Sequence, residues 1–380
     1  MLQGHKLYDA DAHVELSPRM WEGLESAYIP RRPRPAWIGD NQGMGTWNNG
    51  WLVEGQMHPH PFGPGSQPGS MPRKMLKEFS PSSAMPEFPI SGADLSDPEA
   101  RLRDLAELGI DIQFLFPTTL YARMTSDPGF ESALYRAYNR YMGRQCKSYS
   151  KQLKWAALLP LRDTPKGCEA VAEMVELGAS AAVVYGTVGD RLLSDLSFTP
   201  VWDEFSRTGL PLCVHMGMSY SPFEQLSRNI FDAHIIGMCL PALLAFAAIV
   251  GHGMLDRYPD LKVAFLEFGA EWILYMVGRM DHYLPIDKGR QMPVTEGMPR
   301  DSIKDYVKSG RIFVGGEADD VLMPQEIELM GENQILYSSD FPHPEARENS
   351  AKQILARTDL SETQKRKIFY DNPVSLYGEP

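Results

Sequence analysis

The feature that most constrains this sequence is a series of short apolar runs that alternate with segments of helical periodicity. Such alternation is typical of parallel βαβ units whose strands are covered on both faces. We count eight runs, at residues 7–13, 110–116, 153–159, 181–185, 210–215, 261–267, 311–315 and 334–339. Eight units predict an α/β fold, a distorted (β/α)8 TIM barrel, with an open doubly wound sheet as the alternative. The first run is not followed by a glycine-rich phosphate fingerprint, which favours the barrel.

The segment at residues 17–90 differs from the rest of the chain. It is rich in Pro, Gly, Met and Trp and shows little periodicity. Irregular stretches this long inside a compact domain are unusual and are often functional. We therefore expect one barrel domain over residues 1–380, in which residues 17–90 form an insertion that covers the barrel mouth and supplies apolar walls to the pocket.

Composition favours a cytoplasmic enzyme with a small-molecule substrate. A formal net charge of −12 argues against nucleic acid and anionic membranes as partners, because both need a basic face. The four cysteines lack short pairings, which is typical of a reducing compartment. Residues 1–6 lack the apolar core of a signal peptide.

A second apolar feature is the run Ile235–Val250. It is short for a membrane span and contains Pro241. Its sixteen largely apolar residues exceed what one face of a surface helix needs. We expect a buried helix that lies partly in a subunit interface, and hence a homodimer.

Histidine and carboxylate residues recur where the predicted strands end. In a barrel of this kind, the chemistry lies at the C-terminal ends of the strands. Those ends carry Asp11 and His13 on the first strand, His215 on the fifth, Glu267 on the sixth, Glu317 just past the seventh and Asp340 after the eighth. Imidazoles and carboxylates that meet at one rim predict a metal centre.

The segments around these residues resemble the amidohydrolase superfamily, in the branch of aminocarboxymuconate-semialdehyde decarboxylase and γ-resorcylate decarboxylase. The shared motifs are DADAH at residues 9–13, VH at 214–215, DRYPDLK at 256–262 leading into Glu267, and SSDFPHP at 338–344. The resemblance implies a barrel of the metal-dependent hydrolase type. It also implies that Asp11, His13, His215 and Asp340 hold a divalent metal.

Two positions depart from the pattern of that branch. Its first-strand motif is often His-x-His or Glu-x-His, whereas this chain has Asp11-x-His13. The position that matches Glu267 is a catalytic histidine in the two decarboxylases named above. Glu267 and His343 are our catalytic candidates, and together they could complete a second metal position. Zinc accepts such ligands, and a site this rich in oxygen also suits manganese or iron.

We therefore expect a metal-dependent hydrolase of a carbonyl substrate with a C–C, ester or thioester, or amide bond. Glu267 would accept the proton of a metal-activated water. The alternative is a metal-dependent, non-oxidative decarboxylase of an aromatic or enoic acid, and a third possibility is a binding protein without metal. The aromatic residues of the insertion suggest a bulky apolar or aromatic acid as substrate.

Overall fold

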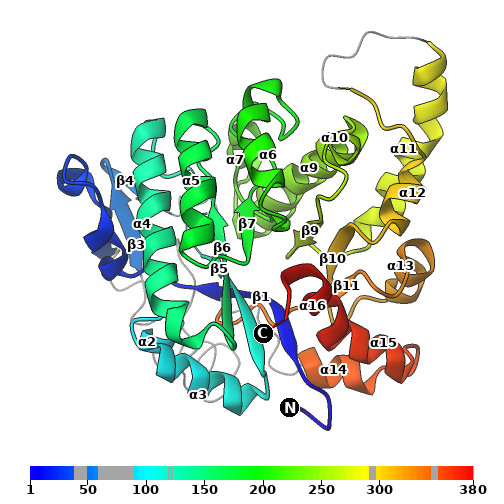
Figure 1. The fold of residues 1–380 in the computed structure, drawn as a ribbon, viewed down its shortest axis with the longest axis horizontal. Coiled ribbons are helices and arrows are strands. Elements are labelled where there is room, and N and C mark those ends of the chain that lie inside the picture. Colours follow the sequence, from blue (N-terminus) through cyan, green and yellow to red (C-terminus); the bar gives the residue numbers. More distant parts are fainter. Residues whose placement is uncertain are drawn as a thin grey trace.

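Eight parallel strands form one sheet that curves into a nearly closed barrel (Figure 1). The structure is a computed structural model that describes residues 1–37, 49–58, 90–118, 120, 123–290, 297–343 and 350–379. The sheet order is that of the chain: β1 (Tyr8–Val14), β5 (Ile112–Pro117), β6 (Leu153–Leu158), β7 (Ala181–Val184), β8 (Leu212–His215), β9 (Val263–Leu266), β10 (Ile312–Gly316) and β11 (Ile335–Tyr337). The predicted barrel is confirmed, and each predicted run overlaps one of these strands.

Helices surround the sheet and connect its strands (Figure 1). Several begin at an Asp cap next to proline: Asp97, for example, accepts hydrogen bonds from the backbone N–H groups of Glu99 and Ala100. The helices are α2 (Ile90–Ala93), α3 (Pro98–Leu108), α4 (Pro128–Cys146), α5 (Thr164–Glu176), α6 (Thr199–Ser206), α7 (Ser221–Leu226), α8 (Ile230–Asp232), α9 (Leu240–Gly251), α10 (Met254–Arg257), α11 (Trp272–Gly289), α12 (Ile303–Lys308), α13 (Met323–Met330), α14 (Ser350–Ala356), α15 (Glu362–Arg366) and α16 (Asn372–Tyr377).

The segment that follows β11 closes the barrel against β1. The backbone N–H of His13 donates to the carbonyl of Phe341 at 2.7 Å, and that of Asp340 donates to the carbonyl of Asp11 at 3.1 Å. Arg101 of α3 stabilises this junction from the interior of the protein. Its guanidinium is buried and donates to the carbonyls of His13 and Phe341 at 2.7 and 3.3 Å. One buried side chain therefore ties together the first strand and the end of the last.

The apolar helix predicted at Ile235–Val250 belongs to the outer layer of the barrel. A π-helical segment, Ala233–Cys239, runs into α9, which packs against β8 and α11. The span Ala233–Gly251 is long and apolar enough to cross a membrane by length and composition alone, and 56% of it is buried in the protein. Ile235 is 51% exposed in the single chain, so its burial depends on the predicted subunit interface. Its part in a subunit interface remains a prediction.

The insertion contains a small antiparallel sheet that the sequence did not indicate. Its strands are β2 (Arg34–Trp37), β3 (Asn49–Val53) and β4 (Gln56–His58). Glu54, in the turn between β3 and β4, accepts a hydrogen bond from Thr125, which lies beyond the C-terminal end of β5. Residues 38–48 and 59–89 lie outside the described part of the chain. The covering of the barrel mouth by residues 17–90 therefore remains a prediction.

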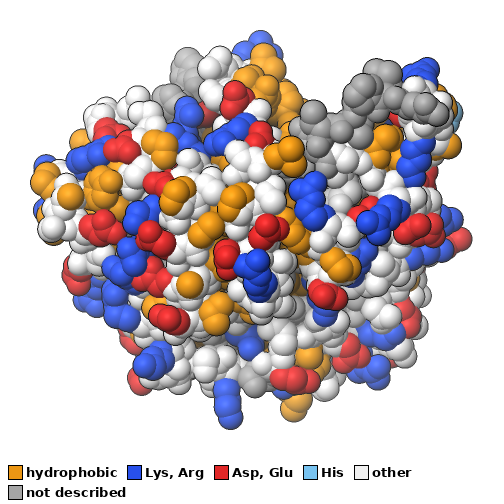
Figure 2. All heavy atoms as spheres, turned by 45° about the horizontal axis from the view of Figure 1, so that its top comes forward, with side chains coloured by type: hydrophobic (Ala, Val, Ile, Leu, Met, Phe, Trp, Pro, Cys, Tyr) orange, Lys and Arg blue, Asp and Glu red, His pale blue; other side chains and the backbone are white. Residues whose placement is uncertain are grey.

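Charged side chains of both signs are mixed over the face drawn in Figure 2, with apolar side chains between them. On this face the acidic side chains lie among basic ones, although the chain as a whole has a formal net charge of −12.

The buried position of Arg101 predicts a large effect of its removal. Arg101→Met removes the buried donor to the carbonyl of His13 and leaves the carbonyl of Phe341 with only the backbone N–H of His13. We expect it to lower the free energy of unfolding by about 3 to 5 kcal/mol. Urea denaturation of the purified variant measures this loss. Arg103→Met is the matched control, because Arg103 lies on the same helix with its side chain 65% exposed. Equal urea midpoints for the two variants would contradict the role given to Arg101.

Candidate metal centre

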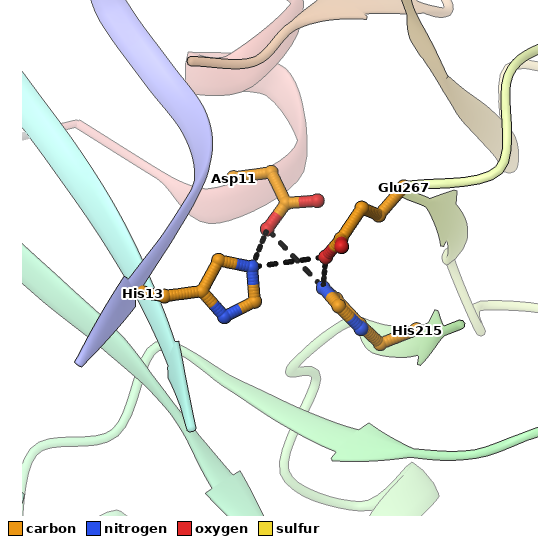
Figure 3. Close-up of side chains that lie close together, drawn as sticks. All are labelled: Asp11, His13, His215 and Glu267. Atoms are coloured by element: carbon orange, nitrogen blue, oxygen red, sulfur yellow. Dashed lines mark hydrogen bonds and ion pairs between the residues drawn. The ribbon is translucent and has the colours of Figure 1, made fainter. Parts of the chain in front are cut away.

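The predicted metal ligands converge at the C-terminal rim of the barrel (Figure 3). Asp11 and His13 lie on β1, and His215 is the last residue of β8. Glu267 follows β9 directly, and Asp340 and His343 follow β11. All six are brought together in two overlapping groups of potential ligand atoms.

The first group consists of Asp11, His13, His215 and Glu267, whose ligand atoms all lie within 4.8 Å of one another. Nε2 of His13 donates to Oε2 of Glu267 at 2.9 Å, and Nε2 of His215 lies 2.7 Å from the same oxygen. Oδ1 of Asp11 lies 3.7 Å from Nε2 of His13 and 3.5 Å from Nε2 of His215. The four side chains thus surround one small volume (Figure 3).

The second group shares His13 and Glu267 with the first and adds Asp340 and His343. Oδ1 of Asp340 lies 3.2 Å from Nε2 of His13 and 2.8 Å from Nδ1 of His343. The rings of His13 and His343 stack with centroids 3.9 Å apart. Nε2 of His343 lies 3.2 Å from the hydroxyl of Thr118, a contact that the sequence did not reveal.

Two of the carboxylates stand on strained backbone. Glu267 has φ of +67° and Asp340 has φ of +54°, both in the left-handed region that non-glycine residues rarely adopt. Each such residue costs about 1 to 3 kcal/mol and persists where the surrounding structure enforces it. In both cases the strained residue follows a strand end, and its carboxylate turns in toward His13.

Buried polar atoms in the cluster support a cation as its missing partner. Both carboxylate oxygens of Asp11 and Nε2 of His215 are buried and make no hydrogen bond of regular geometry with the described residues, although they lie close to one another and to Glu267. Nδ1 of His215 lies 2.9 Å from the carbonyl of Met216, and its N–H can donate there while Nε2 faces the cluster. Metal-bound histidines commonly have this outer hydrogen bond. The residues present therefore fit a divalent metal.

The electrostatics of the cluster lead to the same conclusion. Burial opposes a charge on His215, but Glu267 and Asp11 outweigh burial and raise its pKa well above the usual value. Burial also opposes a charge on Glu267, yet His215 and His13 hold the pKa of this carboxyl well below its usual range. The carboxylates thus stabilise positive charge within the cluster, and either protons on the histidines or a bound cation can supply that charge.

A supporting layer lies beneath the cluster, and sequence analysis missed it. Asp9 is fully buried and accepts hydrogen bonds from the backbone N–H and hydroxyl of Ser339 and from the side chain of Gln113. Burial raises the pKa of Asp9 to about 7 despite these bonds. Asp9 therefore fixes β1 to the segment that carries Asp340. Asp9 is the first aspartate of the DADAH motif, and this was the one sign in the sequence of the supporting layer.

A cavity of about 200 Å³ opens beside the cluster. Its walls come from the segments that follow β8, β9, β10 and β11, including Met216, Glu267, Glu317 and Asp340. Glu317 thus faces the cavity but belongs to neither ligand group. Two carboxylates of the cluster, Glu267 and Asp340, therefore face this cavity.

Comparisons with known proteins give a family and a fold. The amidohydrolase family model matches residues 9–378. A curated relative, 2-amino-3-carboxymuconate-6-semialdehyde decarboxylase of Dictyostelium discoideum, is 22% identical over 287 residues, which cover 74% of this chain and 77% of the relative.

Two solved structures share the fold along nearly the whole chain. An amidohydrolase of Mycobacterium avium subsp. paratuberculosis superposes with a TM-score of 0.77 at 19% identity and covers 99% of both chains. The 5-carboxyvanillate decarboxylase of Novosphingobium aromaticivorans was solved with manganese and 4-hydroxy-3-methoxy-5-nitrobenzoic acid. It superposes with a TM-score of 0.68 at 16% identity and covers 99% of this chain and 97% of that one.

The geometry predicts that His215 is needed for metal retention. His215→Ala removes an imidazole whose Nε2 faces the cluster, and we expect bound metal per chain to fall at least about tenfold. Elemental analysis of the dialysed proteins measures it. His252→Ala is the control, because Nδ1 of His252 contacts Ser194 and the residue belongs to neither ligand group. Full metal content in His215→Ala would remove His215 from the ligand set.

Proposed function

This chain belongs to the amidohydrolase family, and from that premise we propose that it is a metal-dependent, non-oxidative decarboxylase of an aromatic or enoic acid. The curated relative and one of the two solved structures named above are decarboxylases, which favours this alternative over the hydrolysis that the sequence put first. We propose Asp11, His13, His215 and Asp340 as the metal ligands, with Glu267 beside them.

The observation that carries the proposal is the position of His343. Decarboxylation needs an acid near the metal, and Glu267 stands where the resemblance led us to expect a catalytic histidine. His343 supplies an imidazole at the same cluster. It is buried, stacks on His13, and lies 2.8 Å from Asp340 through Nδ1.

The reaction requires one bond to break and one to form. The bond between the carboxylate carbon and the ring or alkene carbon breaks, and its electron pair stays on the ring or alkene carbon. Carbon dioxide leaves, and protonated His343 donates its proton to that carbon. Asp340 stabilises the charged imidazole before transfer, and Thr118 holds its other nitrogen at 3.2 Å.

The remaining residues orient the substrate and the ligands. A divalent metal, when bound, would act as a Lewis acid toward the oxygens of the substrate. Glu267 fixes the two histidines through Oε2, because that oxygen lies 2.9 Å from Nε2 of His13 and 2.7 Å from Nε2 of His215. Manganese suits a set of two carboxylates and two imidazoles with a third carboxylate beside it, and zinc and iron are the other candidates.

Hydrolysis remains the second candidate because of one specific feature. Glu267 is a carboxylate that both contacts the histidines and lines the cavity. A carboxylate at this point can accept the proton of an attacking water. In this case His343 and Glu267 would complete the second ligand group, as the sequence analysis allowed.

The substrate is proposed to be a small aromatic acid, since the solved decarboxylase above carries a nitrobenzoic acid. A homodimer and a cytoplasmic location remain predictions from the sequence. The cavity of about 200 Å³ leaves room for a compact acid beside the cluster.

Product analysis separates the two reactions. We expect a panel of hydroxy- and methoxybenzoic acids and of enoic acids to contain a substrate that releases one carbon dioxide per product. In D2O the product should carry deuterium at the vacated carbon, and in H2 18O it should gain no oxygen. Solvent oxygen in the organic product, without carbon dioxide release, would establish hydrolysis instead.

Replacing the acid tests the role of His343 directly. His343→Gln keeps a polar side chain but cannot donate the proton, so we expect kcat to fall about 10²-fold or more with bound metal unchanged. Steady-state kinetics and elemental analysis of the same preparation measure both quantities. A variant that loses metal together with activity would make His343 a metal ligand rather than the acid.

A further inference from the structure

Three carboxylates lie together outside the candidate metal centre. Glu271 directly precedes α11, Asp320 lies between β10 and α13, and Glu326 lies in the first turns of α13. One oxygen from each lies within 4.8 Å of the other two. We call this group the three-carboxylate site.

The two inner members of the site, Asp320 and Glu326, are buried and contact each other, yet three of their four carboxylate oxygens lack a protein donor among the described residues. Glu326 is fully buried, and neither of its carboxylate oxygens accepts a hydrogen bond from the described residues. Asp320 is 2% exposed. Its Oδ1 accepts the backbone N–H of Leu322 at 2.8 Å, whereas its Oδ2 has no such partner in the described part of the chain. Burying ionised carboxylates whose oxygens lack a hydrogen-bond donor is costly in free energy unless their charge is neutralised.

Arg357 is near the site, but its hydrogen bonds are directed elsewhere. Nη1 donates to the backbone carbonyls of Ala318 and Asp320, and Nε and Nη2 donate to Asp359 at 3.0 and 2.7 Å. Burial, together with Asp320 and Glu271, raises the pKa of Glu326 to about 9 despite the charge of Arg357. The site therefore needs another positive species, either a shared proton or a cation.

We propose that the three-carboxylate site binds a hard divalent cation, with Ca²⁺ as the best match. Its candidate ligand atoms are all carboxylate oxygens, which suit Ca²⁺ and Mg²⁺, and the site has no imidazole or thiolate that would favour zinc. Glu271 is exposed, so it offers an entry path and leaves room for the water ligands that such ions retain. The mixed imidazole and carboxylate centre described above has a different metal preference.

The position of the site gives the cation a structural effect. It joins the segment after β9 to the segment after β10, and both segments contribute walls to the cavity through Gly269, Glu317 and Ala318. It also holds α13 against the start of α11, two helices that pack together. Cation binding would thus fix one side of the cavity without contacting the substrate.

A cation and a shared proton compete for the same oxygens. Because the pKa of Glu326 is about 9 without a cation, binding near neutral pH must displace a proton. The affinity for Ca²⁺ should then rise up to about tenfold per pH unit between pH 7 and 9. The charged groups that face Glu326 are Asp320, Glu271 and Arg357.

Calorimetry with CaCl2 on the full-length, metal-loaded protein tests the proposal. We expect one Ca²⁺ per chain at pH 8, with a Kd below about 1 mM, together with a rise in thermal midpoint. Glu326→Gln and Glu271→Gln should each weaken the Kd at least about tenfold. Glu271→Gln changes an exposed side chain, so its result does not depend on core packing. Elemental analysis counts any calcium that copurifies.

Glu328→Gln is the matched control, because Glu328 is exposed on the same helix. It should bind Ca²⁺ as the unaltered protein does. No binding up to about 10 mM Ca²⁺, beyond the weakest Kd expected, would overturn the proposal and leave a shared proton between Asp320 and Glu326. Binding that survives both glutamine variants but is lost in His215→Ala would also overturn it, because Ca²⁺ would then occupy the candidate metal centre.

Discussion

The junction between β1 and the segment after β11 is the interaction on which the candidate site depends. Two backbone hydrogen bonds join these segments, between His13 and Phe341 and between Asp340 and Asp11. Asp9 and Arg101 support them from inside the protein. Ligands from both ends of the chain therefore share one rigid base, and their spacing follows from barrel closure rather than from a flexible loop.

The fold and the candidate ligands could be predicted because they leave local signals. Each strand is a short apolar run, and Asp11, His13, His215 and Glu267 stand where such runs end. The supporting contacts leave no such signal. Arg101 is 88 residues from His13 and 240 residues from Phe341, and neither composition nor spacing predicts that pairing. Likewise, apolar composition indicated the helix near Ile235 but not that Ile235 itself is half exposed.

The chemistry at the centre depends on which residue supplies the proton. The structure brings Glu267 between His13 and His215 and stacks the ring of His343 on that of His13. Sequence analysis treated the glutamate as a sign of hydrolysis, because a catalytic histidine was expected at that position. With His343 in the same cluster, a carboxylate at position 267 is compatible with proton donation to carbon. In the proposed reaction, the proton comes from His343, after the last strand, and not from position 267 as in the family that the sequence resembles.

The closure of the barrel also sets the order in which the centre can be built. Asp9 and Ser339, whose side chains hydrogen-bond across the junction, are 330 residues apart. At about 5 to 20 residues per second, a ribosome needs roughly 15 to 65 seconds to make the intervening chain. During that time Asp11 and His13 are already synthesised, while Asp340 does not yet exist. The complete set of proposed ligands is therefore present only after synthesis of the last strand, so a metal held by all of them could bind only late in translation or after it.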